Sequence, residues 1–384
     1  MKRLTGIVFL FLLLVTAGCG IFKPAKPEQP EFFTVAEWNV QALFDGQETG
    51  KEYGEYLQAA GWNAEKYKAR LTAISQAIPE MAGAGSFPTG SFPTGKGTSP
   101  DGKAEHKMIV PDLIGFVELE NIKVLEDLAG GTLSKYGYFW TAFAAIPGSS
   151  LGIGIMSRFP LIETRAHSIT VGEKTAPRPV LEIRVEPDGN PGMKPLVFLL
   201  CHWKSKLGGD SATEAQRRSS ARVVQRRLRE LKETEADTPV IVMGDLNENH
   251  DEYYRRSAFT ALLPDDPDAA AVAVQEPVEF LVLSAEKPPQ ASFFENAGVV
   301  ALYSPWGEEI SMGSYNYKDE WETIDHFLLS DGLFNGAGWN FAGCRVLNHP
   351  PFTGTDGKPN TYVPRTGRGL SDHLPLLLYL RNVK

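Results

Sequence analysis

A series of short polar motifs along the chain carries the side chains that metal-assisted hydrolysis needs. Each motif closes or interrupts an apolar stretch: Glu37-Trp38-Asn39-Val40, Val117-Glu118, His202-Trp203-Lys204-Ser205-Lys206, Gly244-Asp245-Leu246-Asn247, Ile324-Asp325-His326 and Ser371-Asp372-His373. A phosphodiester resists hydrolysis because its charged oxygens repel nucleophiles and its leaving alkoxide is basic. A catalyst therefore needs a cation, a base for the attacking water and help for the leaving group. Carboxylates, carboxamides and imidazoles delivered by successive strand ends can meet all three needs.

The elements that would position these motifs follow from the apolar pattern. Short β-rich runs predict strands at 32–38, 113–117, 138–144, 152–156, 180–185, 196–201, 240–243, 324–329 and 374–380. Helical spacing predicts a helix that ends at Pro79 and a second that begins near Thr213, where Thr213-Glu214-Ala215-Gln216 is typical of a capping box. The stretch 265–290 is loop-rich. Together these elements indicate a layered α/β domain with buried sheets.

In this order and these contexts, the motifs resemble the endonuclease/exonuclease/phosphatase superfamily of metal-dependent phosphoesterases. The superfamily includes pancreatic-type deoxyribonucleases, apurinic endonucleases, bacterial sphingomyelinases and inositol-polyphosphate phosphatases. The resemblance spans about residues 32 to 380. It implies an α/β fold, a four-layered sandwich of two mostly antiparallel β-sheets flanked by helices, with the catalytic site at one end. We expect one catalytic domain over 32–384, because the motifs of a single site run from residue 39 to residue 373.

The resemblance also implies a metal site. Glu118 matches the metal-binding glutamate, Asn39 the asparagine beside it, and Asp372 a ligand of the same or a second metal. Oxygen-only ligands suit Mg²⁺ or Mn²⁺ rather than Zn²⁺, which favours His and Cys. Asp245 would contact the nucleophilic water or the metal, and Asn247 would donate to a phosphate oxygen. The structural alternatives are an exposed acid at a strand end and an Asx-turn.

Two histidines have expected catalytic roles. His373 matches the closing signature of the superfamily, and Asp325 matches the acid that orients it and favours its protonated form, so the pair has the logic of a base and its orienter. His202 resembles the general acid of deoxyribonucleases and sphingomyelinases. Its acidic partner is not evident in the sequence. His326 is expected to be structural.

The resemblance also implies that cations in two places bind substrate phosphate: Arg178, Lys204 and Lys206. The alternative for each is a surface salt bridge. The net charge of −9 argues against indiscriminate binding of nucleic acid by the whole surface. Basic residues nevertheless outnumber acidic ones from 202 to 232, and part of that run is a solvated helix face.

The N-terminus is typical of an export signal. Lys2 and Arg3 precede an apolar run that is too short to span a bilayer, and Thr16-Ala17-Gly18-Cys19 follows it. This segment resembles the lipobox of bacterial lipoproteins, in which the cysteine is acylated, although Thr16 replaces the usual Leu. An ordinary secretory signal is the alternative. We expect a lipoprotein signal peptide at 1–19 with lipidation of Cys19, a tether at 20–31, and a membrane-anchored location in the cell envelope, outside the cytoplasm.

Two features remain outside these motifs. A tandem repeat, Gly85-Ser86-Phe87-Pro88-Thr89-Gly90 followed by Ser91-Phe92-Pro93-Thr94-Gly95, lies in a Gly/Pro/Ser-rich stretch and predicts a flexible surface insertion at about 82–104. Cys201 and Cys344 could pair in an exported protein. The apolar run before Cys201 favours a buried strand thiol instead.

The function that these observations favour is an extracytoplasmic, Mg²⁺-dependent phosphoesterase. We expect a monomeric nuclease of low sequence specificity, with nucleic acid as its substrate. One alternative is a sphingomyelinase-like or other phospholipid or small-molecule phosphoesterase. An alternative of another class is a catalytically inactive surface-binding lipoprotein. The sequence does not separate DNA, RNA, nucleotide and phospholipid substrates, endo- from exo-cleavage, or one metal from two.

Overall fold

The computed structural model describes residues 30–83, 110–176, 178–187, 193–273, 278–294 and 298–383. The signal peptide, Cys19, nearly all of the tether and the tandem repeat of the 82–104 insertion lie outside the described residues. Within them, no helix is long and apolar enough to cross a membrane.

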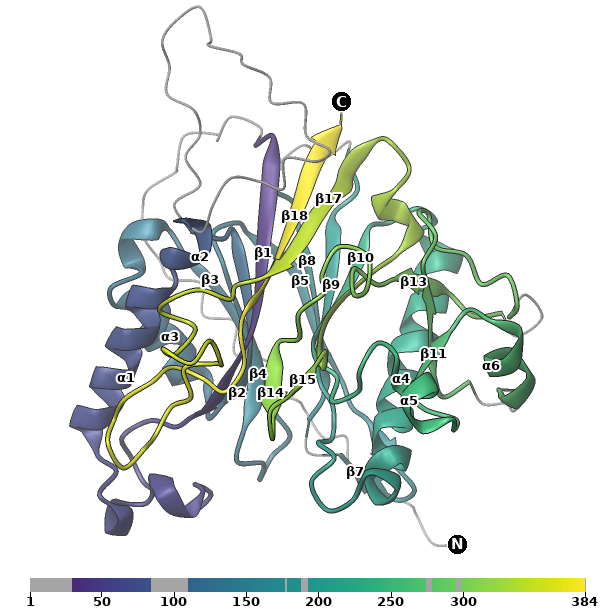
Figure 1. Ribbon diagram of the computed structural model, residues 1–384. Coiled ribbons are helices and arrows are strands. Elements are labelled where there is room, and N and C mark those ends of the chain that lie inside the picture. Colours follow the sequence, from purple (N-terminus) through teal and green to yellow (C-terminus); the bar gives the residue numbers. More distant parts are fainter. Residues whose placement is uncertain are drawn as a thin grey trace, which may run out of the picture.

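Two large sheets form the centre of the molecule (Figure 1). The six-stranded sheet has the order β17 (Gly338–Val346), β18 (Leu376–Val383), β1 (Phe32–Leu43), β2 (Leu113–Leu119), β4 (Gly152–Ser157) and β3 (Trp140–Ala144). The eight-stranded sheet has the order β11 (Leu262–Pro264), β12 (Leu281–Ser284), β13 (Ala301–Tyr303), β16 (Asp325–Leu329), β10 (Val240–Asp245), β9 (Leu196–His202), β8 (Val180–Val185) and β5 (Leu161–His167). Two small hairpins pair β6 (Thr170–Val171) with β7 (Lys174–Thr175) and β14 (Tyr315–Tyr317) with β15 (Glu320–Glu322).

Most neighbouring strands in the described part of the sheets are antiparallel. The parallel pairs are β1 with β2, β9 with β10, β11 with β12, and β12 with β13. Strands β8, β9 and β10 are buried along their whole length. Strands β9 and β10 are accordingly nearly continuous apolar runs in the sequence, whereas β8 also carries the buried charged residues Glu182 and Arg184.

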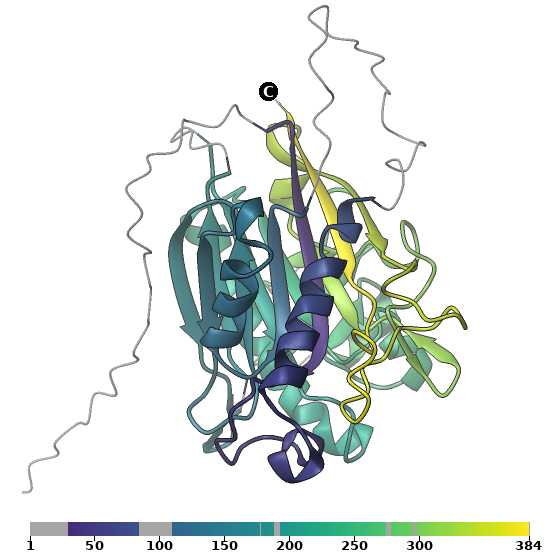
Figure 2. The same cartoon turned by 90° about the vertical axis from the view of Figure 1, so that its left-hand side faces the viewer.

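Helices cover the outer face of each sheet and complete four layers. On the six-stranded sheet lie α1 (Ala64–Ala77) and α3 (Ile122–Gly130), which appear side by side in Figure 2. On the eight-stranded sheet lies α4 (Asp210–Thr234), whose Val224 and Leu228 share an apolar cluster with Val197 and Val242. The shorter helices are α2 (Glu80–Gly83), α5 (Glu252–Arg256) and α6 (Pro267–Val272), with 3₁₀ turns at Gly54–Tyr56, Gln58–Ala60, Ser134–Tyr136 and Asp331–Leu333. The predicted four-layered α/β sandwich is confirmed.

Two sequence predictions of local structure are wrong. Helix α4 begins at Asp210 after Gly209, a turn earlier than predicted, and the Thr213 hydroxyl donates to the carbonyl of Gly209 (3.0 Å) instead of capping the helix. The stretch 265–290 contains α6 and β12, which are short elements that a search for long periodic runs overlooks. Cys201 and Cys344 are both free and buried, as predicted for Cys201.

Candidate active site

The strand register brings the polar motifs to one end of the sandwich. Asp245, the last residue of β10, lies opposite Asp325 of β16 on one side and His202 of β9 on the other. On the six-stranded sheet, Asn39 lies opposite the residue that precedes Glu118. The Asn39 amide donates to Asp245 Oδ2 across the sandwich (3.1 Å). One constellation therefore draws its side chains from both sheets.

His373 and Asp325 form a buried pair. His373 Nδ1 donates to Asp325 Oδ2 (2.8 Å), and the same oxygen accepts a hydrogen bond from the Ser314 hydroxyl (2.6 Å). Burial alone would lower the pKa of His373. The charge and hydrogen bond of Asp325, with the charges of Asp372 and Asp245, outweigh burial and raise that pKa well above its usual value. His373 is therefore an imidazolium near neutral pH.

Asp245 is the acid best suited to take a proton. Its Oδ1 accepts from the backbone N–H of Asn247 (2.9 Å). Burial, and then the negative charge of Asp325, raise the pKa of Asp245 to about 7. A base works best when its pKa lies near the operating pH. A protonated imidazole has no free lone pair, so with these pKa directions Asp245 can act as a base and His373 as a hydrogen-bond donor; the sequence analysis predicted His373 as the base, and that role stays a prediction.

His202 is neutral in the free protein. Burial, followed by the positive charges of Arg178, His373 and Lys204, lowers its pKa well below the usual value. Its Nε2 lies 3.7 Å from Glu118 Oε1 and 3.7 Å from Asp245 Oδ2. These are the acidic neighbours that the sequence did not reveal. A neutral imidazole has a single N–H, so His202 can donate one hydrogen bond but does not carry a positive charge.

The oxygen donors near Glu118 fit a hard divalent cation. Glu118 Oε2 accepts from the Ala42 N–H (2.7 Å), and its side chain keeps 21% of its surface exposed. Glu118 and Asp325 both contribute to the raised pKa of Asp372, whose largest cause is burial, so these acids share one neighbourhood. Asp245, Asp325 and His373 also have ligand atoms within 4.8 Å of one another. Because His373 is protonated, the cation is better held by Glu118, Asn39 and Asp372.

The backbone around these residues is strained. Gln41, Ala42, Glu118 and Asn247 all have positive φ, at 51°, 52°, 69° and 53°. Positive φ is uncommon outside glycine and is tolerated where the surroundings enforce it. The buried Arg70 supplies part of that support, because its guanidinium donates to the carbonyls of Gln41 (2.6 Å) and Ala42 (3.1 Å).

The predicted substrate-binding cations lie close to the candidate active site but differ in the protein groups that they already contact. Arg178 donates to the Trp203 carbonyl (2.7 Å), and its charge lowers the pKa of His202. Lys204 Nζ contacts Ser205 Oγ and the Leu207 carbonyl (both 3.3 Å). Lys206 is paired with the buried Glu252 (2.7 Å). Arg178 and Lys204 are therefore better placed than Lys206 to receive a phosphate.

Three residues of the site had no role in the sequence analysis. The Ser314 hydroxyl holds Asp325, and the Ser371 hydroxyl donates to the Asn39 carbonyl (2.6 Å) and accepts from the His373 N–H (3.1 Å). Glu37 is fully buried, and its carboxyl oxygens have no hydrogen-bond partner among the described residues. Burial, and then the charges of Asp325 and Asp245, raise the pKa of Glu37 well above its usual value. Glu37 and Ser371 lie inside motifs that the sequence analysis identified, and this position was the sequence signal that could have pointed to them.

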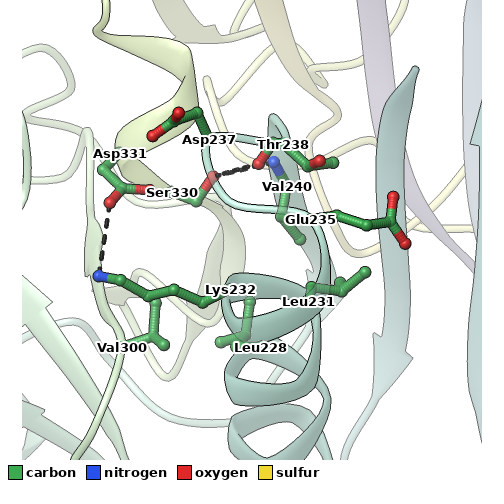
Figure 3. A pocket seen from close by; sticks show the side chains of 10 residues that line it. All are labelled: Leu228, Leu231, Lys232, Glu235, Asp237, Thr238, Val240, Val300, Ser330 and Asp331. Atoms are coloured by element: carbon green, nitrogen blue, oxygen red, sulfur yellow. Dashed lines mark hydrogen bonds and ion pairs between the residues drawn. The ribbon is translucent and has the colours of Figure 1, made fainter. Parts of the chain in front are cut away.

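A separate pocket lies at the other end of the same strands (Figure 3). It is lined by residues before β10 and after β16, including Thr238 and Ser330, and the ion pair between Lys232 and Asp331 (3.5 Å) borders it. Asp245 and Asp325 of the candidate active site are at the opposite ends of β10 and β16. This pocket is therefore not part of the active site.

Comparisons with known proteins find a family match in the sequence and similar folds among solved structures. Residues 102–272 match the family model described as "Endonuclease/Exonuclease/phosphatase family". The fold is similar to a humanized D. rerio TDP2 with 14 mutations (TM-score 0.50, 14% identity, 92% of this chain and 100% of that one). Matches also include an endonuclease/exonuclease/phosphatase family protein (TM-score 0.48, 16% identity, 92% and 99% of the two chains) and the mannosyl-6-phosphatase Bt3783 (TM-score 0.47, 16% identity, 91% and 99%), both from Bacteroides thetaiotaomicron. The curated proteins contain no match.

The family match, the fold and the strand-end constellation identify the class. Residues 102–272 match the endonuclease/exonuclease/phosphatase family, and together with the fold and the strand-end constellation this match defines a metal-dependent hydrolase of phosphoester bonds. When bound, the metal would polarise the phosphoryl group and neutralise developing charge. Around it, Asp245 can take a proton from water, and Asn247 and protonated His373 can donate to phosphate oxygens.

Proposed function

We propose that this hydrolase is a Mg²⁺-dependent nuclease of low sequence specificity. One observation carries the choice of substrate: Arg178, which donates to the Trp203 carbonyl (2.7 Å), and Lys204 both lie at the segment that directly follows His202. Fixed cations beside the reacting groups suit the phosphate backbone, which carries no base information. The oxygen donors of Glu118, Asn39 and Asp372 favour Mg²⁺ or Mn²⁺ as the metal.

The basic run of α4 gives this proposal less support than the sequence suggested. Its arginines are largely paired with carboxylates in the structure: Arg217 with Glu248, Arg218 and Arg222 with Glu279, and Arg227 with Glu182. Paired charges release few counterions when nucleic acid binds. The salt dependence of binding should therefore be shallow and should correspond to about two phosphate contacts, a slope near −1.5 in a plot of log K against log salt.

Substrate competition tests the proposal directly. The purified protein with Mg²⁺ is given plasmid DNA, RNA, sphingomyelin and a small phosphodiester, and kcat/KM is measured for each. We expect either nucleic acid to exceed sphingomyelin by at least about tenfold, with similar rates for DNA of different sequence. Replacing Lys204 by Met should raise KM for DNA and flatten the salt slope, whereas Lys232→Met, at the remote pocket, should change neither. A preference for sphingomyelin would overturn the nuclease assignment.

We further propose that the enzyme works outside the cytoplasm, anchored through a lipid on Cys19. The support is the lipobox-like segment Thr16-Ala17-Gly18-Cys19 after a short apolar run. Cys19→Ser should abolish lipid labelling in cells and release the protein from the membrane fraction. Unchanged partitioning would contradict the anchor.

A further inference from the structure

The hairpin formed by β14 and β15 is fixed beside the catalytic histidine. Its tight turn holds Lys318 and Asp319 at φ of 50° and 71°, which is typical of a type I′ hairpin. At its base, the N–H of Leu374 donates to the Ser314 carbonyl (2.8 Å), which ties the hairpin to the segment of His373. At its tip, Asp319 forms an ion pair with Lys358. The hairpin is therefore attached at both ends.

Three aromatic rings form a row from the candidate active site to solvent. They belong to His373 and to Tyr315 and Tyr317 of the hairpin. The Tyr315 ring lies 4.6 Å from the His373 ring, centroid to centroid, at 31°. The Tyr317 ring lies 6.5 Å from the Tyr315 ring and is nearly parallel to it, at 12°. Alternate residues of a strand project to the same face, so the two tyrosines follow one another along a single side of β14.

The outermost ring contributes little to the core. Tyr317 is 50% exposed, whereas Tyr315 is half-buried against His373. Lys318 Nζ lies 5.0 Å from the Tyr317 ring centroid. A rigidly mounted, exposed aromatic ring with a cation beside it has the two properties of a single-strand binding platform, a π-face for a base and a positive charge for the backbone.

We propose that Tyr317 stacks on the nucleobase next to the scissile phosphate. This inference rests on the proposed nuclease function and specifies its substrate as unpaired or locally opened nucleic acid. The scissile phosphate must sit at His373, so the neighbouring nucleotide lies along the row of rings that starts there. Stacking tolerates any base because every base has a π-face, which agrees with low sequence specificity.

The contact that a ligand makes with the Tyr317 ring distinguishes a nucleobase from other kinds of ligand. A sugar or a lipid head group has no planar aromatic face to stack. An acyl chain would be served as well by leucine as by tyrosine. Tyr317→Phe keeps the ring and Tyr317→Leu keeps only apolar bulk, so the pair of variants distinguishes stacking from simple hydrophobic contact.

The test uses an internal comparison within one substrate. A single-stranded oligothymidylate carries one abasic tetrahydrofuran residue at its centre, and the full-length protein cleaves it with Mg²⁺ while the product at each bond is quantified. We expect wild type and Tyr317→Phe to cleave a bond that flanks the abasic residue about five- to a hundredfold more slowly than the other bonds. Tyr317→Leu should cleave all bonds nearly evenly.

Controls make the outcomes distinct. Phe139→Leu removes an exposed ring that precedes β3, at the end of the sandwich opposite Glu118, and should keep the wild-type pattern. An even pattern in wild type, or an uneven pattern that persists in Tyr317→Leu, would overturn the stacking subsite while the nuclease function stands. Failure to cleave the oligonucleotide, its unmodified counterpart, plasmid and RNA would overturn both.

Discussion

At the scale of single residues, burial and neighbouring charge assign the roles in the site. His202, His373 and Asp245 are all buried and lie close together, yet their pKa values move in different directions. The charge and hydrogen bond of Asp325 raise the pKa of His373, whereas burial, followed by the positive charges of Arg178, His373 and Lys204, lowers the pKa of His202. Groups whose environments separate their pKa values in this way are the expected donors and acceptors of an acid–base reaction.

The pair of His373 and Asp325 should act as one unit. His373→Ala and Asp325→Ala are each expected to lower kcat by about 10²- to 10⁴-fold, because either change removes the protonated imidazole. The double variant should be little worse than His373→Ala, since Asp325 then has nothing to hold. The measurement is the kcat of the three variants under steady-state conditions. A double variant whose fold-loss in kcat equals the product of the two single losses would refute the pair.

The two thiols in the sheets should be inert. Burial raises the pKa of Cys201 to about 12 and raises that of Cys344 as well, so neither forms the reactive thiolate at pH 8. Iodoacetamide should leave both unmodified in the native protein and modify both after denaturation, as read by peptide mass spectrometry. Rapid labelling of native Cys201 would show that β9 is more accessible than the structure indicates.

At the scale of elements, α4 is fastened to the loops that carry the site. Arg217 has no exposed side-chain surface and donates to Glu248 Oε1 (2.9 Å) and to the Lys204 carbonyl (3.3 Å). Glu248 directly follows Asn247, and its Oε2 accepts from the Leu262 N–H (3.0 Å). One helix residue thus joins the loops after β9 and β10.

Breaking this junction should be costly. Arg217→Met is expected to lower the free energy of unfolding by about 3 to 5 kcal/mol, because it leaves the buried carboxyl groups of Glu248 and Glu214 without their guanidinium partner. Arg226→Met on the same helix removes an exposed pair with Glu230 and should cost less than about 1 kcal/mol. Chemical denaturation of both variants gives the comparison, and equal losses would contradict the structural role of Arg217.

How well an element could be predicted from the sequence depended on its length and on whether its contacts lie nearby or far along the chain. The long apolar strand β9 and the family motifs were readable, because their signals lie within one stretch of sequence. The hairpin with Tyr315 was not, because each of its strands spans only three residues and its position depends on His373, far along the chain. The pairing of Arg217 and Arg227 was also hidden, since their partners Glu248 and Glu182 come from other elements.

At the scale of the whole molecule, the fold concentrates acids at one end of the sandwich. Glu118, Asp245, Asp325 and Asp372 come from both sheets and from the segment before β18, and their mutual repulsion is partly relieved by protons when no cation is bound. The sequence identified these residues through family motifs. It did not show Glu37 beneath them, or that His202 lies between Glu118 and Asp245.

Metal affinity should therefore rise with pH. Asp372, a proposed ligand, has a raised pKa and must release its proton when a cation binds. Asp245, a neighbouring acid with a pKa of about 7, loses its proton more readily once the cation's positive charge is close. We expect the Kd for Mg²⁺ to fall by up to about tenfold per pH unit below pH 7 and to level off above it. Calorimetry in two buffers of different ionisation enthalpy should show proton release near pH 6.5. A Kd that is constant from about pH 5.5 to 8 would contradict these protonation states.

The central claim is that Glu118 anchors a catalytic divalent cation at the strand ends. The most direct measurement is phosphodiester hydrolysis by wild type and Glu118→Gln with Mg²⁺ and with excess chelator, together with the melting temperature of each protein in chelator. We predict that chelator abolishes wild-type turnover, that Glu118→Gln loses at least about 10²-fold in kcat/KM with Mg²⁺, and that the two melting temperatures agree within a few degrees. Full turnover in chelator, or a Glu118→Gln variant as active as wild type, would contradict the claim.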